Sequence, residues 1–574
     1  MQKYLLVFVL TAFSFSAFTQ GTFVPLNGDA VTYLERLDIK FSKILPVQHT
    51  GDKPYHRGNA AKIAETLMLS NLRFNKTLQS QVQYLIDDNA DWTDSIVSKT
   101  RKPIWKFYRE PASFLHVSSK KKGLFDIRFN PVIDVKLGAE SYNSRFNFQR
   151  VIGLEVRGNI KRVFSFYFSV LGSSARAPKY ITEKAISTSP YNNLVFIPGQ
   201  SYYKIYSSKL FKYTDALDYF DARGYVNINV LKYMNLSFGR DKFFIGNGQR
   251  SLFLSDNAAP YLFLKFNINV WRFNYQSIFA EITNQYVRGS DQLLPKKYMA
   301  VHHLSIQATH WLNLGLYESV IMKRSNHFEL QYLNPIIFYR SVEHALGSPD
   351  NVMIGGDFKM NFVNHLSIYG QFLFDEFNFS HIFKRDGWWA NKYGIQVGIK
   401  YIDIVPNLDA QIEFNFVRPF TYTHSEEVNY THYNQPLAHP LGANFYEFIL
   451  NVRYQPIPRL SINAKYFMAK VGDDTLQNGV PTNFGGDIFR STGYGGSTVT
   501  NDLNNKVAQG AKGTINYLQL LATYRAWHNI YFDLELLYRS KSTLKSSNNP
   551  LVGASSLMFS VGARMNLPYK RYEF

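Results

Sequence analysis

Apolar and polar residues alternate along most of the chain from about Leu124 onward. The stretches "RVFSFYFSVLG" (162–172), "YGIQVGIKY" (393–401), "LDAQIEFNF" (408–416) and "IYFDLELLYRS" (530–540) all repeat with a period of two. This period predicts β-strands that have one apolar face and one polar or charged face.

The same pattern recurs often enough to predict a large sheet. We expect eighteen strands, near residues 124–137, 145–158, 162–172, 218–230, 234–241, 260–270, 272–283, 298–309, 312–323, 352–363, 365–377, 392–403, 408–422, 443–456, 460–472, 515–527, 530–542 and 555–567.

The links between these strands alternate between short and long. Short links such as "NIK", "KYM", "HW", "PIP" and "HN" alternate with longer ones, of which the longest are 173–217, 324–351, 423–442 and 473–514. Short turns on one rim and long loops on the other are typical of outer-membrane barrels, whose apolar face meets lipid. We therefore predict an all-β transmembrane barrel. The ending "RMNLPYKRYEF", with its terminal Phe574, resembles the insertion signal of such barrels.

The N-terminal part has a different pattern. In "LNGDAVTYLERLDIKFSKI" the apolar residues recur at helical spacing, and Asn27 or Asp29 could cap the helix. A second helical stretch is predicted from about residue 59 to 87, followed by a linker around "RKPIW" and "REPASF". We expect a small periplasmic helical domain.

The first residues, "MQKYLLVFVLTAFSFSAFTQG", combine Lys3, an apolar run and small residues at a cleavage site before Gln20. This predicts a secretory signal peptide. The expected organisation is a signal peptide over 1–19, the helical domain and linker over 20–120, and the barrel over 121–574. The expected location is the outer membrane of a Gram-negative bacterium.

Composition narrows the expected function. The 574 residues include no cysteine, which excludes disulfides and thiolate metal sites, and 16% are aromatic. The net charge of +20 favours anionic partners. Since an exported chain does not meet cytoplasmic nucleic acid, we expect no nucleic-acid partner. Acidic surface polysaccharide, outer-membrane lipid and lipopolysaccharide fit the charge.

Residues 239–261, "GRDKFFIGNGQRSLFLSDNAAPY", place Gly246 and Gly248 among polar and basic residues. No G-K-[ST] follows, and there is neither a third glycine nor a helix after the stretch. It therefore matches neither a phosphate-binding loop nor a dinucleotide-binding motif. We expect the glycines to allow a folded loop where Cβ atoms would clash.

Histidines offer only weak evidence for metal chemistry. His302 and His303 are adjacent in a strand and point to opposite faces. The loop 423–442 carries His424, His432 and His439, which fit a solvated or sugar-facing surface better than a zinc site. The chain also lacks a G-x-S-x-G elbow. We therefore predict no enzyme, no metal and no cofactor.

Charged residues of both signs are expected to face the lumen. By alternation they are Glu413, Glu447, Arg453, Lys465, Arg525, Asp533, Glu535, Arg539 and Arg564. Mixed signs predict mutual pairing and a plugged or narrow lumen, because an open pore more often carries one sign.

Four stretches resemble the Wzi family of capsule-assembly proteins, in particular its Bacteroidetes branch, which includes gliding-motility proteins of the RemB type. They are "VPLNGDAVTYLERLDIKFSKI" with "KPYHRGNAAKIAETL", the stretch 239–261, "LQYLNPIIFYRSVEHALGSPDNVMIGGDFKM" and "NYTHYNQPLAHPLGANFYEF". In the second, Asp256 replaces an Asn of the family pattern and Asn247 replaces a Pro.

The resemblance implies an 18-stranded outer-membrane barrel with a helical bundle that binds surface polysaccharide and performs no covalent chemistry. Candidate sugar contacts are Arg240, Asp241, Arg250, Asp256, Asn257, Tyr261, Tyr430, His432, Tyr433 and His439. Two alternatives stay open: a gliding-motility or secretion component that acts through an envelope protein partner, and a passive porin-like channel.

Overall fold

A computed structural model of the 574-residue chain describes residues 21–574, except for 47–48, 71, 94–112, 120–123, 142–144, 187–197, 202, 209–212, 285–292, 325–328, 335–337, 348–349, 425–426, 478–479, 494–495 and 544–554. The predicted signal peptide and nearly all of the predicted linker lie outside the described residues. None of the described helices is long and apolar enough to span a membrane.

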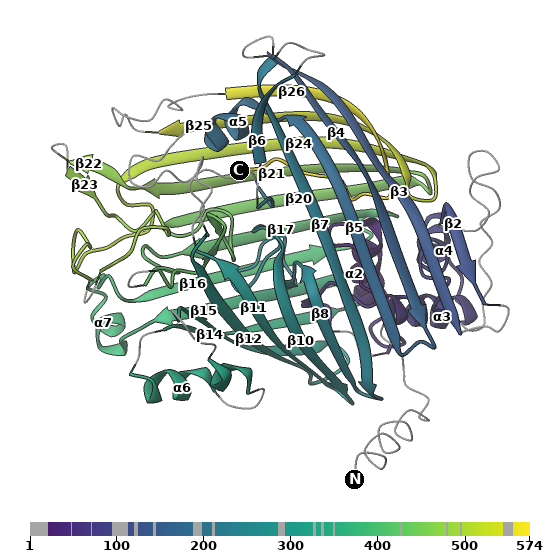
Figure 1. The fold of residues 1–574 in the computed structure, drawn as a ribbon, viewed down its shortest axis with the longest axis horizontal. Helices are drawn as coiled ribbons and strands as arrows, with labels where there is room; N and C mark the ends of the chain where they lie inside the picture. Colours follow the sequence, from purple (N-terminus) through teal and green to yellow (C-terminus); the bar gives the residue numbers. More distant parts are fainter. Residues whose placement is uncertain are drawn as a thin grey trace.

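Within the described residues, eighteen antiparallel strands form a closed barrel (Figure 1). In chain order they are β3 (Phe125–Glu140), β4 (Arg145–Ile160), β5 (Phe164–Arg176), β7 (Tyr213–Leu231), β8 (Met234–Asp241), β10 (Tyr261–Val270), β11 (Phe273–Thr283), β12 (Lys296–Gln307), β13 (Leu312–Met322), β14 (Asn351–Phe362), β15 (Leu366–Glu376), β16 (Lys392–Tyr401), β17 (Leu408–Val417), β20 (Phe445–Ile457), β21 (Leu460–Asp473), β24 (Ala511–Trp527), β25 (Ile530–Thr543) and β26 (Ser555–Met565).

The barrel closes where β26 pairs with β3, from Met558 opposite Glu140 to Met565 opposite Ile133. Two shorter strands, β2 (Leu115–Ser118) and β6 (Tyr203–Ser208), extend the edges of β3 and β7. The predicted eighteen-strand barrel is confirmed, because each predicted strand coincides with one strand of the ring.

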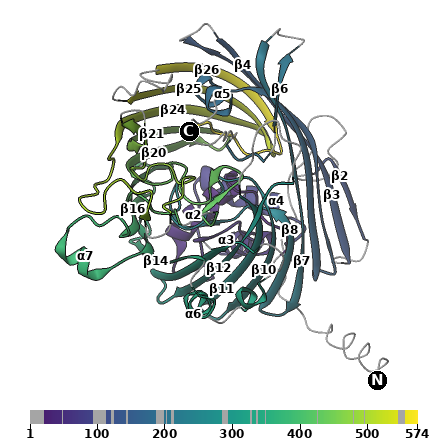
Figure 2. The same cartoon turned by 60° about the vertical axis from the view of Figure 1, so that its left-hand side comes forward.

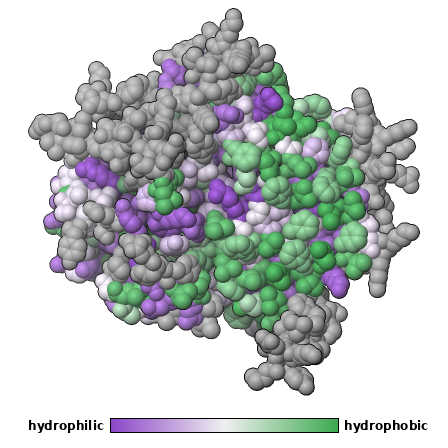
Figure 3. Space-filling model, viewed as in Figure 1, coloured by the Kyte–Doolittle hydropathy of each residue, from purple (hydrophilic) through white to green (hydrophobic). Residues whose placement is uncertain are grey.

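Alternation along the strands separates an apolar outer face from a polar lumen. On β25, Phe532, Leu534 and Leu536 are 51%, 48% and 42% exposed, while the intervening Asp533 and Glu535 are buried. Figure 3 shows such apolar residues gathered in a broad band over the outer wall. A broad apolar band outside and charges inside fit a wall that is solvated by lipid.

The two ends of the barrel differ, as Figure 1 shows. Short turns join the strands at one end, which we call the short-turn end. At the other, the long-loop end, lie α5 (Lys179–Ile186), the 3-10 helix η3 (Leu330–Leu333), α6 (Tyr339–Ala345), α7 (Phe379–Lys384) and the hairpins β18–β19 (Thr431–His432, Gln435–Pro436) and β22–β23 (Thr475–Gln477, Val480–Thr482).

Three N-terminal helices lie within the ring of strands at the short-turn end (Figure 2). They are α2 (Asp29–Phe41), α3 (Arg57–Leu69) and α4 (Lys76–Asp88), and together they enclose an apolar cluster of their own. The second predicted helical stretch is divided in two, because the Asn75 side chain accepts a hydrogen bond from Leu78 N and caps α4. Gly28, not Asn27 or Asp29, occupies the N-cap of α2.

Ion pairs fix these helices to the barrel. Arg36, 3% exposed, bonds the turn residue Asp403 and reaches Asp409 at 2.9 Å. Glu35 bonds Lys400 of β16 at 2.7 Å, and Asp38 bonds Lys359 of β14. We call the described residues from 21 to 93, which contain α2–α4, the helical plug.

Two further segments fold into the lumen. Residues 242–260 leave the wall after β8, pair with the plug through β1 (Asp52–Lys53) and β9 (Phe244–Ile245), and return to the wall at β10. Beyond β26, residues 566–574 fold back into the barrel, where Phe574 is 9% exposed and its ring centroid lies 5.1 Å from that of Phe467. Phe574 therefore lies in the lumen and is not part of the last strand.

Candidate functional site

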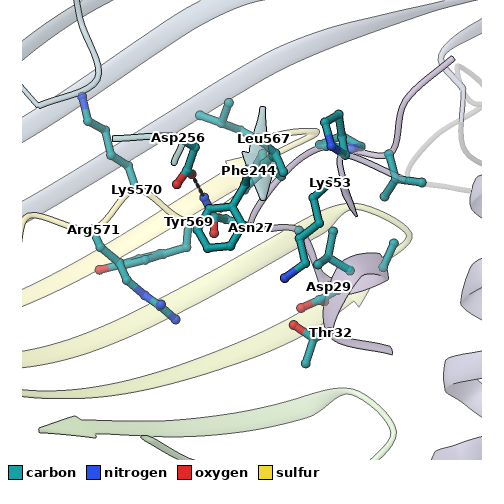
Figure 4. A pocket seen from close by; sticks show the side chains of 18 of the residues that line it. Asn27, Asp29, Thr32, Lys53, Phe244, Asp256, Leu567, Tyr569, Lys570 and Arg571 are labelled. Carbon is teal, nitrogen blue, oxygen red and sulfur yellow. Dashed lines mark hydrogen bonds between the residues drawn. The ribbon is translucent and has the colours of Figure 1, made fainter. Parts of the chain in front are cut away.

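A cavity of about 640 Å³ lies inside the barrel, between the plug, the inward loop 242–260, the C-terminal segment 566–574 and the wall. Figure 4 shows side chains from the plug, the inward loop and the C-terminal segment meeting across it, with Asn27 of the plug bonded to Asp256 of the inward loop at 2.5 Å. Parts of the chain that are far apart in sequence thus build one chamber.

Its lining combines apolar surface with many charged groups, of which more are basic than acidic. The basic ones are Arg36, Lys53, Arg57, Arg157, Arg223, Lys242, Arg250, Lys400, Arg453, Lys465, Arg564, Lys570 and Arg571, and the acidic ones are Asp29, Glu35, Asp88, Glu155, Asp221, Asp241, Asp256, Asp409 and Glu573. An excess of positive charge in a confined space favours anionic ligands.

Arg250 is the hub of the charge network beside this cavity. Its guanidinium bonds Glu447 of β20 at 3.1 Å and Glu573 of the C-terminal segment at 2.5 Å. It also lies 4.9 Å from the centre of the Phe574 ring. Burial alone would lower the pKa of Arg250, but these two carboxylates raise it above its usual range. Arg250 therefore stays charged and joins the inward loop, the wall and the C-terminal segment.

The two glycines of the inward loop allow this close approach. A Cβ on Gly248 would lie 2.5 Å from Glu413 Oε2 and 2.8 Å from Arg250 O. Gly246 has φ +148°, and a Cβ there would lie 2.7 Å from Gln371 Nε2. The predicted reason for these glycines, that a side chain would clash in a folded loop, is confirmed.

Lys242 is a buried amine at the edge of the cavity. Its Nζ donates to the carbonyl oxygens of Gly199 at 3.1 Å and Asp256 at 3.2 Å. Burial lowers the pKa of Lys242 to about 7, with the nearby Arg223 adding to the effect. An amine this poorly solvated gains most from an additional acceptor such as a hydroxyl or carboxylate.

Three of the four predicted contacts in the long loop are packed into the interior, and the fourth, Tyr433, is half-buried. Tyr430 and His439 are 1% and 0% exposed, and His439 Nε2 lies 2.8 Å from Glu447 Oε2. His432 accepts a hydrogen bond at Nδ1 from Thr283 N (2.9 Å), so its imidazole is neutral. Burial lowers the pKa of His432 to about 3 and also lowers that of His439.

The other predicted contacts divide into two groups. Asp241, Arg250, Asp256 and Asn257 line the cavity, and Tyr261 is buried with its hydroxyl accepting from Phe243 N at 3.3 Å. The remaining two, Arg240 and Tyr433, do not line it. Arg240 shares the outward face of β8 with Phe238 and donates to Ser201 Oγ at 3.3 Å. Sugar contact by any of these residues stays a prediction.

Sequence reasoning missed the contribution of the plug and of the C-terminal segment. Asn27, Asp29 and Lys53 reach the cavity from the plug, and Lys570 and Arg571 reach it from the chain end. Periodicity could not show this, because both segments reach the site through loop conformation and not through strand register.

The expected charge pairing in the lumen is present. Arg564 bonds Asp533 at 2.7 Å, and Glu535 bonds Lys136 at 2.6 Å. Among the described residues, no group of three or more acidic or histidine side chains is arranged to hold a metal ion.

Comparison with known proteins gives a consistent result. Residues 139–549 match the family described as capsule assembly protein Wzi. The fold is similar to that of Wzi of Escherichia coli, described as an outer membrane protein involved in group 1 capsule assembly and a carbohydrate-binding β-barrel. The two are 12% identical with a TM-score of 0.56, covering 96% of this chain and 100% of the other.

Two other proteins of known structure show weaker similarity to the chain. OccAB2 of Acinetobacter baumannii is 8% identical with a TM-score of 0.41, and the match covers 76% of this chain and 97% of OccAB2. OprD of Pseudomonas aeruginosa is 9% identical with a TM-score of 0.39, and the match covers 76% of this chain and 94% of OprD. No curated protein matches the chain. The family match spans well over half of the sequence, and the chain therefore belongs to the Wzi capsule assembly family of outer-membrane β-barrels.

Proposed function

We propose that this barrel binds chains of surface polysaccharide and holds them at the cell surface without covalent chemistry. The observation that carries the proposal is a polar chamber in a barrel of the Wzi family, lined by guanidinium, carboxylate, amide and tyrosine groups. Such planar polar groups bond sugar hydroxyls, and aromatic rings stack on sugar faces.

The side of the cavity formed by Asp256, Asn257, Lys570 and Arg571 is the proposed contact. Arg571 is exposed, so the cavity reaches solvent there. Asp256 Oδ2 is held by Asn27, and Lys570 donates to Tyr219 OH at 3.0 Å. With two cations beside one carboxylate, the ligand we propose is an acidic polysaccharide.

A binding measurement with purified protein tests this proposal. We expect Lys570→Ala and Arg571→Ala each to weaken binding of acidic capsular polymer about tenfold, since a charge-assisted hydrogen bond contributes roughly 1.5–3 kcal/mol. Lys506→Ala is the matched control, because Lys506 is exposed on an outer loop and is bonded through its backbone N–H. Wild-type binding by both cavity variants would contradict the assignment.

Point variants are a cleaner test than removal of the whole loop 425–440. That segment contains the buried Tyr430, His432 and His439, so its deletion would remove part of the core along with any ligand contact.

The structure gives less support to the two alternatives. The plug, the inward loop and the C-terminal segment all occupy the lumen, which disfavours a wide passive channel. A gliding-motility or secretion role through an envelope protein stays a prediction that membrane cross-linking would test.

A further inference from the structure

Part of the outer wall is covered by the chain itself. On β13, Leu314 and Leu316 point outward and are 44% and 60% exposed. Glu318, Val320 and Met322 have the same parity and so face the same side. Glu318 is nevertheless only 7% exposed and the other two are fully buried.

The cover is the segment that contains α6, which lies outside the ring of strands in Figures 1 and 2. Tyr339 and Val342 of α6 belong to one apolar cluster with Val320, Met322 and Val352 of the wall. The same segment hides polar groups of the outer face. Its Arg340 N donates to Glu318 Oε1 at 3.2 Å, and its Tyr339 ring lies 4.0 Å from the ring of His302.

The height of α6 follows from the length of β13. This strand has 11 residues, and at about 3.3 Å per residue and a tilt of about 40° it rises about 28 Å, close to the roughly 25 Å apolar band of a membrane barrel. The covered positions 318–322 form the half nearer the long-loop end. Since long loops of such barrels face the outside, α6 lies at the depth of the outer leaflet.

The outer side of the α6 segment is apolar with a cationic edge. Phe338 is 76% exposed and Leu330 67%, and Arg340 beside them is 58% exposed. At the depth derived above, these side chains face lipid and not water.

A second helix, α7, continues the lipid-facing surface in a neighbouring sector. Phe372, on the outer face of β15, begins a ladder of phenylalanine rings with centroids 6.0, 5.2, 5.0 and 6.4 Å apart; the successive members are Phe374, Phe377, Phe379 and Phe383. The last two are 59% and 81% exposed.

Polar residues flank these rings on α7, where Ser380 and Lys384 are exposed and Arg385 follows directly after the helix. A short helix with an apolar aromatic face and a cationic face is suited to the boundary between acyl chains and headgroups.

We propose that α6 and α7, with the flanking residues 330–334, 338–346 and 377–385, form a lipid-binding surface for a phosphate-bearing lipid of the outer leaflet. Phe338, Phe379 and Phe383 insert among the acyl chains, and Lys384 and Arg385 bind the headgroup phosphate. The site is separate from the sugar cavity, because it lies on the outside of the wall. Its continuity with the lipid-facing belt selects lipid over a soluble partner.

Depth measurement with a spin label tests the apolar part. Because the chain has no cysteine, Phe383→Cys, Phe338→Cys and Ser380→Cys each give one labelling site in the full-length protein. In phosphatidylcholine vesicles we expect labels at 383 and 338 to be several-fold more accessible to oxygen than to a water-soluble nickel chelate. The label at 380, on the polar flank of the same helix, is expected to be relatively more accessible to the nickel chelate than the label at 383. Equal nickel accessibility at 380 and 383 would overturn the proposal.

Retention of lipid A tests the headgroup part. We expect the Lys384→Glu/Arg385→Glu variant to retain several-fold less lipid A per barrel after detergent washing than wild type. Lys506→Glu, which changes an exposed lysine on another outer loop, is the control. Heat-modified electrophoretic mobility verifies that each variant is folded. Equal retention by the double variant and the control would show that these cations do not bind the phosphate.

Discussion

Removal of Arg250 is the sharpest test of how the lumen is held together. Arg250→Ala leaves Glu447 (0% exposed) and Glu573 (9% exposed) without their shared cation. Loss of one partner of a buried ion pair costs about 3–5 kcal/mol. Lys465 still lies 2.7 Å from Glu573, and His439 still lies 2.8 Å from Glu447. We therefore expect the free energy of unfolding to fall by about 3 kcal/mol, the lower end of that range.

Urea unfolding of the purified barrel in lipid vesicles, followed by electrophoretic mobility and tryptophan fluorescence, measures this loss. Limited trypsin digestion adds a local readout, because cleavage after Lys570 or Arg571 reports release of the C-terminal segment. Arg240→Ala is the matched control from the same stretch of sequence, since Arg240 is only partly buried and bonds Ser201. If Arg250→Ala loses less than about 1 kcal/mol and resists trypsin as wild type does, the reasoning is wrong.

Three further tests address other parts of the lumen. Gly248→Ala places a Cβ 2.5 Å from a buried carboxylate oxygen, so we expect the free energy of unfolding to fall by about 1–3 kcal/mol. Gly172→Ala, where a Cβ has more room, should change it little, and equal unfolding midpoints for the two variants would contradict this. Burial lowers the pKa of His432 to about 3. The free energy of unfolding should therefore not depend on this group above about pH 6.5, and below that pH it should fall by up to about 1.4 kcal/mol per pH unit, because only the unfolded state binds the proton. In His432→Gln this acid-dependent loss should shrink, and an unchanged pH profile would refute it. Asp409→Asn removes a carboxylate 2.9 Å from Arg36, so trypsin should cleave the helical plug several-fold faster, which unchanged digestion would disprove.

The sequence determined the barrel. A two-residue repeat with one apolar and one charged face predicts β-strands. The alternation of short and long links indicates which strand ends lie at the same rim of the barrel. The strand from 234 to 241 was predicted with the bounds that the structure gives it. The mixture of charges on lumen-facing positions correctly indicated a filled interior, because opposite charges at such positions need partners.

The candidate site was only partly predictable. Asp241, Arg250, Asp256 and Asn257 have the polar chemistry expected of sugar contacts, and all four line the cavity. His439 has such chemistry too, yet it is buried against Glu447. A loop of polar and aromatic residues has the same composition whether it faces solvent or packs inside, so composition does not distinguish the two.

Only the tertiary structure decided what fills the barrel and what covers it. The plug, the inward loop and the C-terminal segment meet at Arg250 and Asp256 through contacts between residues hundreds of positions apart, such as Arg250 with Glu573. The position of α6 on the outer wall is equally invisible in the sequence, where Glu318 and His302 look like ordinary exposed residues. Local periodicity specifies which face of a strand is apolar, but the packing of irregular segments depends on long-range complementarity that no local pattern records.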